Sequence, residues 1–267
     1  MIYLAFIIAT GLYFLLGSGG PLHSDTWFKT LQRRVDATEP PFWLGFLLLV
    51  VVPCALVGLL WVFLSSLFGA AVTLLLGTAL LFFAFGRADF PTLTQRFMAR
   101  ARAGDDVGAA MILEQAGGDT GADSREAFAR LAARDFLYEG FQRWFPPVFY
   151  FVLLGPLWAV AYRLIQLSAD DRRVPVGSLR HLVDWLPSRV LLLTLALVGD
   201  FERCRRLIGK RAMDPEVETD ALLLEGLEAA FGEEGLDEPA SAVQRVTQGL
   251  KRALVVWLII ISLLAML

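Results

Sequence analysis

The sequence predicts an all-α, polytopic helical membrane protein with about six hydrophobic segments. Apolar residues make up 56% of the 267-residue chain, and its mean hydropathy is +0.58, more apolar than is usual for a soluble domain. The 47 residues between Glu39 and Arg87 contain no Asp, Glu, Lys, Arg or His. At ~1.5 Å per residue they can cross a ~30 Å hydrocarbon core twice. We therefore expect a hairpin there, with Ser65-Ser66 at its turn.

Four further segments are apolar. The uncharged stretch 144–162 is the clearest, and the other three are 1–16, 182–199 and 253–267. These three fall short of the ~20 residues that a full span prefers, so they are expected to tilt little, to thin the bilayer or to stop part-way across it. The first has no Lys or Arg before it and no A-x-A-like site after it, which predicts an uncleaved anchor.

The basic residues predict the orientation. If all six segments cross the membrane, the loops 17–41, 86–140 and 200–252 share one side and hold most of the Lys and Arg, whereas loop 166–181 holds only three. The positive-inside rule then puts the longer loops in the cytoplasm. We expect residues 1–267 to form a single integral membrane domain, with cytoplasmic helical insertions at 86–140 and 200–252.

An alternative topology makes the fourth and fifth segments re-entrant. They would be broken at Gly155-Pro156 and at Pro187, which would bring every basic residue to or near the cytoplasmic side. The length of the fourth segment favours a span, so six spans are the primary prediction.

Loop 86–140 has the pattern of a folded helical layer. It predicts a helix over 92–103, a break at Gly104-Asp105-Asp106 that caps a helix over 107–115, and a tight turn at 117–121. A further helix is expected from Ser124 toward the membrane, interrupted at Pro146-Pro147.

Loop 200–252 divides by charge. A basic cluster (Arg203, Arg205, Arg206, Lys210, Arg211) comes first and is chiefly a topological signal, with an anionic lipid or ligand as the alternative. Ten acidic and no basic residues follow over 214–238. Asp214 is expected to cap an amphipathic helix that begins at Pro215, and the last helix should run unbroken from Pro239 into the membrane. The apolar faces of the two loops predict that they pack together.

The chain lacks the motifs of several enzyme classes. It has no G-x-x-x-x-G-K-[ST] and no G-x-G-x-x-G after a strand, and its two histidines exclude most zinc sites and triads. Cys54 and Cys204 predict neither a disulfide nor a metal framework. Asp105, Asp119 and Asp123 near the glycine-rich turn suggest a Mg²⁺-phosphate site, with helix caps as the alternative interpretation.

Polar residues inside apolar segments indicate a candidate ligand site. Arg189 follows Asp184 and Pro187 at the head of an apolar run, and a charge at that depth is costly unless it is paired or reaches the headgroups. Arg143, Arg163 and Gln166 lie in or beside the neighbouring segments and could share one cavity with Asp184 and Arg189; structural pairing of the same groups is the alternative. We expect Arg189 to face the interior and to pair with Asp184 or with a carbonyl that Pro187 frees.

The stretch Leu182-Val183-Asp184-Trp185-Leu186-Pro187-Ser188-Arg189, continuing to Leu197-Val198-Gly199-Asp200-Phe201, resembles the AmpE family. Members of that family are inner-membrane proteins associated with β-lactamase induction and peptidoglycan recycling. The family is similar to the CobD/CbiB family, membrane enzymes that use ATP to form an amide in cobalamin assembly. Gly117-Gly118-Asp119-Thr120 matches the G-x-D-T element of that second pattern, except that Gly118 stands where an arginine is usual. Other acids and a lysine of the pattern are replaced here.

The resemblance implies a regulatory or accessory protein of the bacterial inner membrane, which modulates β-lactamase induction and peptidoglycan recycling by binding a small ligand or a cell-wall-recycling protein. The alternative is an ATP- and Mg²⁺-dependent amide-forming enzyme related to adenosylcobinamide-phosphate synthase. The predicted ligand site comprises Gly117, Asp119, Thr120, Arg143, Arg163, Gln166, Asp184, Trp185 and Arg189, and the predicted Mg²⁺ ligands are Asp105 and Asp119. The lipid bilayer is an expected partner, and no nucleic-acid partner is expected.

Overall fold

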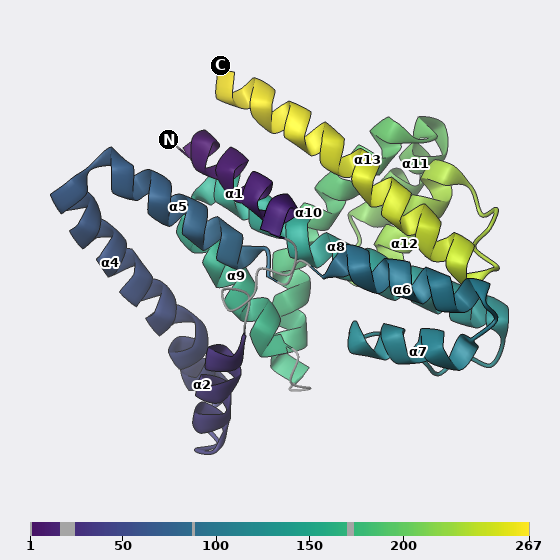
Figure 1. Cartoon of the computed structure of the whole chain (residues 1–267), viewed down its shortest axis with the longest axis horizontal. Helices are drawn as coiled ribbons and strands as arrows, with labels where there is room; N and C mark the ends of the chain where they lie inside the picture. Colours follow the sequence, from purple (N-terminus) through teal and green to yellow (C-terminus); the bar gives the residue numbers. More distant parts are fainter. Residues whose placement is uncertain (1, 17–24, 87–88, 170–173, 267) are drawn as a thin grey trace. The chain divides into compact units, whose positions relative to one another are not determined.

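The computed structural model describes residues 2–16, 25–86, 89–169 and 174–266, and these are almost entirely helical, with no strand among them (Figure 1). The expected all-α class is therefore confirmed. The chain divides into two compact units, one of Met1–Ala88 with Pro146–Val183 and one of Asp89–Phe145 with Asp184–Leu267. Two of the three points at which the chain passes from one unit to the other fall inside helices, α8 (Arg125–Leu154) and α10 (Val174–Val198). The sequence pattern alone does not indicate this division.

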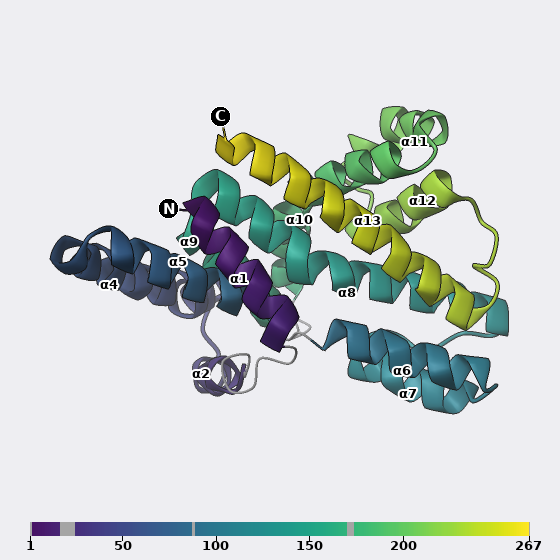
Figure 2. The same cartoon turned by 45° about the horizontal axis from the view of Figure 1, so that its top comes forward.

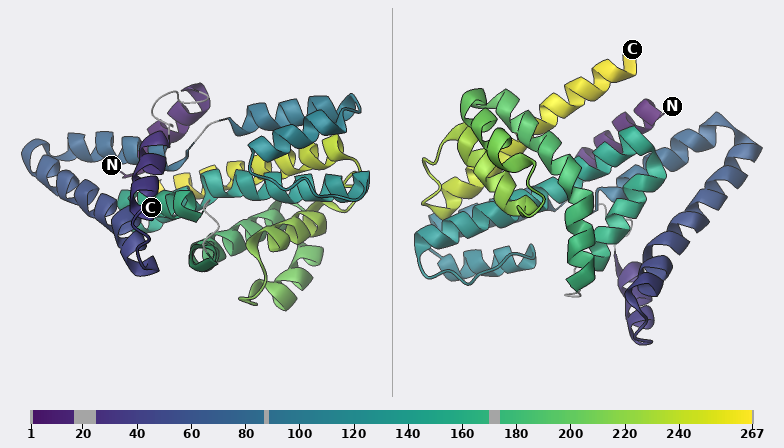
Figure 3. Two further views of the ribbon diagram at one scale, coloured as in Figure 1. Left: turned by 90° about the horizontal axis from the view of Figure 1, so that it is seen from below. Right: turned by 180° about the vertical axis from the view of Figure 1, so that it is seen from behind.

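The predicted hairpin is present in the first unit. Helix α3 (Phe42–Phe46), the π-helical turn η2 (Leu47–Val51) and α4 (Val52–Phe68) form one continuous rod, and α5 (Ala70–Ala84) returns beside it (Figures 1 and 3). The turn lies at Gly69, whose φ of 62° is accessible to glycine at little cost. The prediction of a turn at Ser65-Ser66 was wrong, because both hydroxyls donate to carbonyls three residues back and so remain within α4.

Helix α5 is central in the first unit. It packs against α1 (Ile2–Leu16), α4 and α9 (Pro156–Ala169), and at Gly77 an added Cβ would lie 3.3 Å from the Ala5 Cβ. Small residues at such a crossing let two apolar helices approach closely. Helix α2 (Thr26–Asp36), which the sequence pattern did not predict, buries Phe28 and Val35 against η2 and α9.

The uncharged segment 144–162 is not one straight helix. It is divided at Gly155, where φ is 97°, and Pro156 begins α9. Conversely, the expected interruption at Pro146-Pro147 was wrong, since α8 continues to Leu154. Both prolines are buried beside Phe145 and Val148, so packing outweighs the lost backbone hydrogen bonds. The alternative topology thus finds its break at Gly155 but not at Pro187, because α10 runs through that proline.

The second unit joins the two long loops, as predicted. Helices α6 (Phe90–Arg102) and α7 (Asp106–Gln115) lie side by side (Figure 2), and α6 packs on α13 (Pro239–Met266). Helix α13 runs unbroken from Pro239, as expected. The Phe97 and Phe136 rings lie 5.1 Å apart between α6 and α8, and Arg102 donates to Gln244 of α13.

Helices α11 (Phe201–Leu207) and α12 (Thr219–Phe231) complete the second unit, linked by the π-helical turn η3 (Ile208–Ala212). Leu222, Leu223 and Leu227 form the buried face expected of the acidic region. Asp214 does not cap a helix at Pro215, contrary to the prediction. Its carboxylate accepts from the Glu216 N–H and closes a turn, and the helix begins at Thr219.

Three helices in the described part of the chain are long and apolar enough to cross a membrane: Phe42–Phe68, Leu179–Val198 and Pro239–Leu264. Helices α1 and α5 are apolar but have only 15 residues each. Leu59, Val62 and Phe63 of α4 are each more than 60% exposed, a surface that water disfavours and hydrocarbon does not. The loop predicted over 166–181 is largely helical, and its residues 170–173, like 17–24 of the first loop, lie outside the described residues.

Candidate functional site

Three polar residues in the middle of α10 share its buried face. Asp184, Ser188 and Arg189 are 1%, 0% and 6% exposed, whereas Leu186, Leu193 and Leu197 are about half exposed or more. In a water-soluble helix the exposed face is polar, whereas the exposed face of α10 carries these leucines. Because α10 is long and apolar enough to span a membrane, its polar groups avoid hydrocarbon by facing the protein. The expectation that Arg189 faces the interior is confirmed.

Arg189 holds the segment 208–217 against α10. Its Nε donates to the Ala212 carbonyl at 2.9 Å and its Nη2 to the Asp214 carbonyl at 3.3 Å. Its Nη1 donates to the Ser188 hydroxyl at 3.0 Å, and its guanidinium lies 4.8 Å from the Trp185 ring centre. Beside these bonds Leu192, Ala212, Val217 and Leu222 form a buried cluster. The planar fork of an arginine suits two neighbouring carbonyls as a lysine would not.

The partners of Arg189 differ from those that the sequence favoured. Pro187 has no N–H to offer the carbonyl of Val183, four residues back, but that carbonyl accepts the Tyr150 hydroxyl at 2.7 Å. Asp184, in turn, accepts the Tyr138 hydroxyl at 2.5 Å. The prediction of pairing was right and its favoured partners were wrong, because residues distant in sequence supply closer donors and acceptors.

Arg143 belongs to an ion-pair network within the second unit. It pairs with Glu139 one turn earlier on α8 and with Asp89 just before α6. All three side chains are largely buried, which strengthens their mutual attraction. Sequence reasoning missed Glu139, Asp89 and Tyr138, although the i, i+4 spacing of Glu139 and Arg143 was a visible signal.

Arg163 and Gln166 lie on α9, in the first unit. Arg163 pairs with Asp25 at 2.9 Å, and its guanidinium covers Gly86, where an added Cβ would lie 2.7 Å from the Arg163 Cζ. Gln166 donates to the Tyr162 hydroxyl at 2.8 Å. Arg143, Asp184, Trp185 and Arg189 lie in the second unit. Arg163 thus pairs within the first unit and Arg143 within the second, and a cavity shared by all the predicted residues stays a prediction.

The carboxylates near the glycine-rich turn accept hydrogen bonds from backbone N–H groups. Asp105 caps α7, with its Oδ1 accepting from the Gly108 N–H at 2.8 Å. That bond, assisted by Arg100, holds the pKa of Asp105 below its usual range. The Asp119 Oδ1 accepts from the Gly121 N–H, and the Asp119 N–H donates to Asp135. The helix-cap interpretation of Asp105 is therefore realised, and no group of three metal-ligating side chains occurs among the residues that the structure describes.

Three more features define this turn. Gly117 has a φ of 87°, which favours glycine, and Thr120 is exposed. At Gly118 an added Cβ would lie 2.6 Å from Leu113 Cδ1 and 2.8 Å from Asp135 Oδ2. An arginine at this position would have to displace both side chains. Burial raises the pKa of Asp135, against the opposing effects of the Asp119 N–H and Arg134.

Comparison with models of known protein families, with curated proteins and with solved structures finds no match to this chain. The function is therefore inferred from the geometry of the chain's own residues.

Proposed function

We propose that this chain is a bacterial inner-membrane regulatory or accessory protein that modulates β-lactamase induction and peptidoglycan recycling by binding a small ligand or a partner protein. One observation carries the proposal. The element that bears the AmpE resemblance, 184–189, contributes the buried Asp184, Ser188 and Arg189 to a helix long and apolar enough to cross a membrane. Ionisable groups within a membrane-spanning segment are costly and rare, so they are candidates for a functional site.

The contacts of Arg189 suggest how such a protein transmits a signal. Its guanidinium joins a membrane helix to the backbone of 212–214, directly before the acidic helix α12. A ligand carboxylate or phosphate that captured this guanidinium would release the segment, because both compete for the same donors. The position of α12 would then depend on the ligand.

The uses of the acidic residues favour this role over the amide-forming enzyme. Carboxylate oxygens of Asp105 and Asp119 accept hydrogen bonds from the backbone N–H groups of Gly108 and Gly121. Gly118, in place of the arginine of the enzyme pattern, sits where a side chain would collide with Leu113 and Asp135. These features support a scaffold that has kept its turn without a nucleotide site.

The proposal is tested in cells that lack this protein and carry an inducible β-lactamase. The wild-type chain should restore normal induction, and Arg189→Ala should not, although it inserts in the membrane at the same level. Arg96→Ala is the matched control, because Arg96 is an exposed arginine of α6 in the same unit. Full induction with Arg189→Ala would make Arg189 only a structural anchor.

The enzyme alternative has its own measurement. Titration calorimetry of the purified chain with ATP and MgCl₂ should give no binding heat. Saturable ATP binding that Asp119→Asn removes would reverse the preference.

The proposed orientation is tested by single cysteines at Ser124 and Ser241, after replacement of Cys54 and Cys204. An impermeant maleimide should label both positions only after the inner membrane is broken. Labelling of these positions in intact spheroplasts would show the opposite orientation in the membrane.

A further inference from the structure

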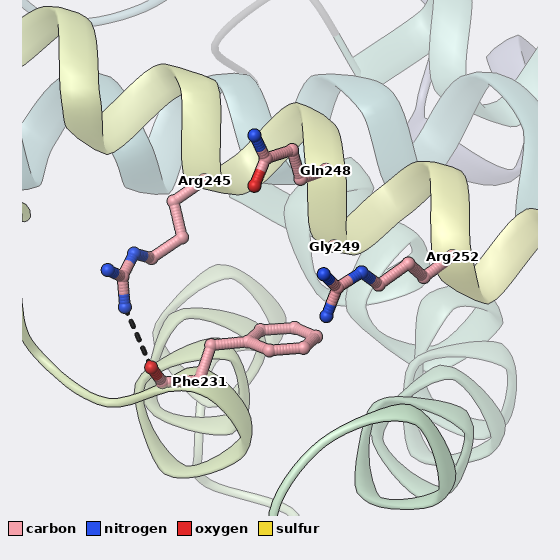
Figure 4. A pocket seen from close by; sticks show the side chains of 5 residues that line it. All are labelled: Phe231, Arg245, Gln248, Gly249 and Arg252. Carbon is pink, nitrogen blue, oxygen red and sulfur yellow. Dashed lines mark hydrogen bonds between the residues drawn. The ribbon is translucent and has the colours of Figure 1, made fainter.

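A polar cavity lies between α12 and α13 in the second unit, away from the polar face of α10. Its volume is about 200 Å³, and it is lined by Phe231, Arg245, Gln248, Gly249 and Arg252 (Figure 4). Gly249 forms one wall, since an added Cβ would lie 2.7 Å from Leu227 and 3.2 Å from the Phe231 ring. No acidic residue lines the cavity.

The two arginines are fixed by the end of α12. Arg245 donates through Nη1 to the carbonyls of Phe231 and Gly232 at 2.7 and 2.9 Å. The Arg252 guanidinium lies over the Phe231 ring, 5.3 Å from its centre. Figure 4 shows both side chains reaching from α13 toward Phe231. Arg252 is nevertheless exposed. The first acidic residues after Phe231, Glu233 and Glu234, are exposed as well. Two cations held this way with an amide between them favour an anionic group.

The cavity lies where two membrane helices of the same unit change from apolar to charged. Trp257 of α13 donates to Thr194 of α10 at 3.0 Å, which fixes the register of the two helices. The first charged residues beyond this contact are Arg252, five residues from Trp257, and Asp200, six residues from Thr194. At ~1.5 Å per residue these lie about 7–9 Å from the shared contact. The Asp200 N–H donates to the Ala230 carbonyl, beside Phe231. The cavity therefore lies where the apolar runs of both helices end, which is where we expect the membrane boundary.

An apolar surface continues from the cavity along α13. Arg245, Arg252 and Ile259 are spaced by seven residues, so they share a face, and Val255 lies between the last two. Val255 and Ile259 are 53% and 54% exposed. Helix α13 carries Arg245, Lys251 and Arg252 and no acid along its length. A molecule that fits this face has an anionic head and an apolar tail.

We propose that this cavity binds the phosphate of an anionic glycerophospholipid, whose acyl chain lies along Val255 and Ile259. The phosphate oxygens accept from Arg245 and Arg252, and the Gln248 amide donates to a headgroup oxygen. The Phe231 ring forms the floor. This inference does not depend on the proposed function, and either can fail without the other.

The test is a titration of the full-length chain in neutral detergent with three probes: dioctanoyl phosphatidylglycerol, dioctanoyl phosphatidylcholine and inorganic phosphate. Native mass spectrometry measures occupancy. Phosphatidylglycerol should bind about tenfold more tightly than phosphatidylcholine, because the choline cation beside the phosphate is repelled by Arg245 and Arg252, whereas the glycerol headgroup carries no positive charge. Arg252→Gln should weaken phosphatidylglycerol binding about tenfold or more, and Arg252→Lys should weaken it less. Arg96→Gln, which removes an exposed charge from α6, should leave the affinity unchanged.

The outcomes separate the two sources of phosphate. Inorganic phosphate that binds as tightly as phosphatidylglycerol would show a site for free phosphate and overturn the lipid assignment. Equal affinity for phosphatidylcholine, or an Arg252→Gln chain that binds like the wild type, would remove the headgroup site. Ile259→Ser provides a second readout: it should weaken phosphatidylglycerol and leave inorganic phosphate unaffected, and an unchanged lipid affinity would contradict the acyl-chain placement. Arg252 is exposed, so its variants are expected to fold.

Discussion

Replacement of Arg189 by Met tests whether this side chain holds the segment 208–217 in place. The change removes two hydrogen bonds to the carbonyls of Ala212 and Asp214 and one to Ser188. A hydrogen bond from a charged group contributes about 1.5–3 kcal/mol net. Methionine fills part of the volume and recovers some burial, so we expect a loss of about 3 kcal/mol, close to the value of two such bonds.

The loss should appear as local opening. Since ~1.4 kcal/mol is a factor of ten, the opening equilibrium of 208–217 should rise about 100-fold in Arg189→Met. Arg189→Lys should raise it about tenfold, because an ammonium reaches one carbonyl and not both. Hydrogen exchange followed by mass spectrometry in detergent measures this directly, and peptides from α13 provide the internal reference. The same exchange rates in wild type and Arg189→Met would refute the assignment. An equal rise in α13 would indicate global destabilisation instead.

Two further predictions concern Asp105, which caps α7, and Asp135 of α8, which accepts the Asp119 N–H. Asp105→Ala should destabilise the chain by about 1 kcal/mol through loss of the α7 cap, as measured by thermal unfolding. Asp105→Asn keeps the hydrogen-bond acceptor, so its stability should stay near that of the wild type. If the Asn variant instead lost Mg²⁺ binding at unchanged stability, Asp105 would be a metal ligand. Burial raises the pKa of Asp135 in the folded chain, so its contribution to stability is fully present below the unfolded pKa of ~3.9 and is lost as the pH rises through the folded value. Unfolding temperatures of wild type and Asp135→Asn should therefore diverge in favour of the variant between pH 4 and 7, and a difference independent of pH would contradict this assignment.

The amino-acid sequence by itself determined the helical class and most of the helices of the second unit. The 47-residue uncharged run required a hairpin, because a membrane tolerates long backbone segments only when they are helical. Asp105 identified the start of α7, and the leucines of the acidic region identified the buried face of α12, since caps and helical periodicity are local properties. The inward direction of Arg189 also followed from the sequence, from the cost of a charge in hydrocarbon.

The tertiary structure decided where breaks fall and which groups pair. Pro146, Pro147 and Pro187 all lie inside helices, whereas Gly69 and Gly155 end them. A proline removes one hydrogen bond, and packing around it or a distant donor such as the Tyr150 hydroxyl can offset that loss. The partners of Arg189, 23 and 25 residues away, depend on how the chain folds back onto α10. Pairing of this kind is a property of three-dimensional proximity, and no spacing along the chain encodes it.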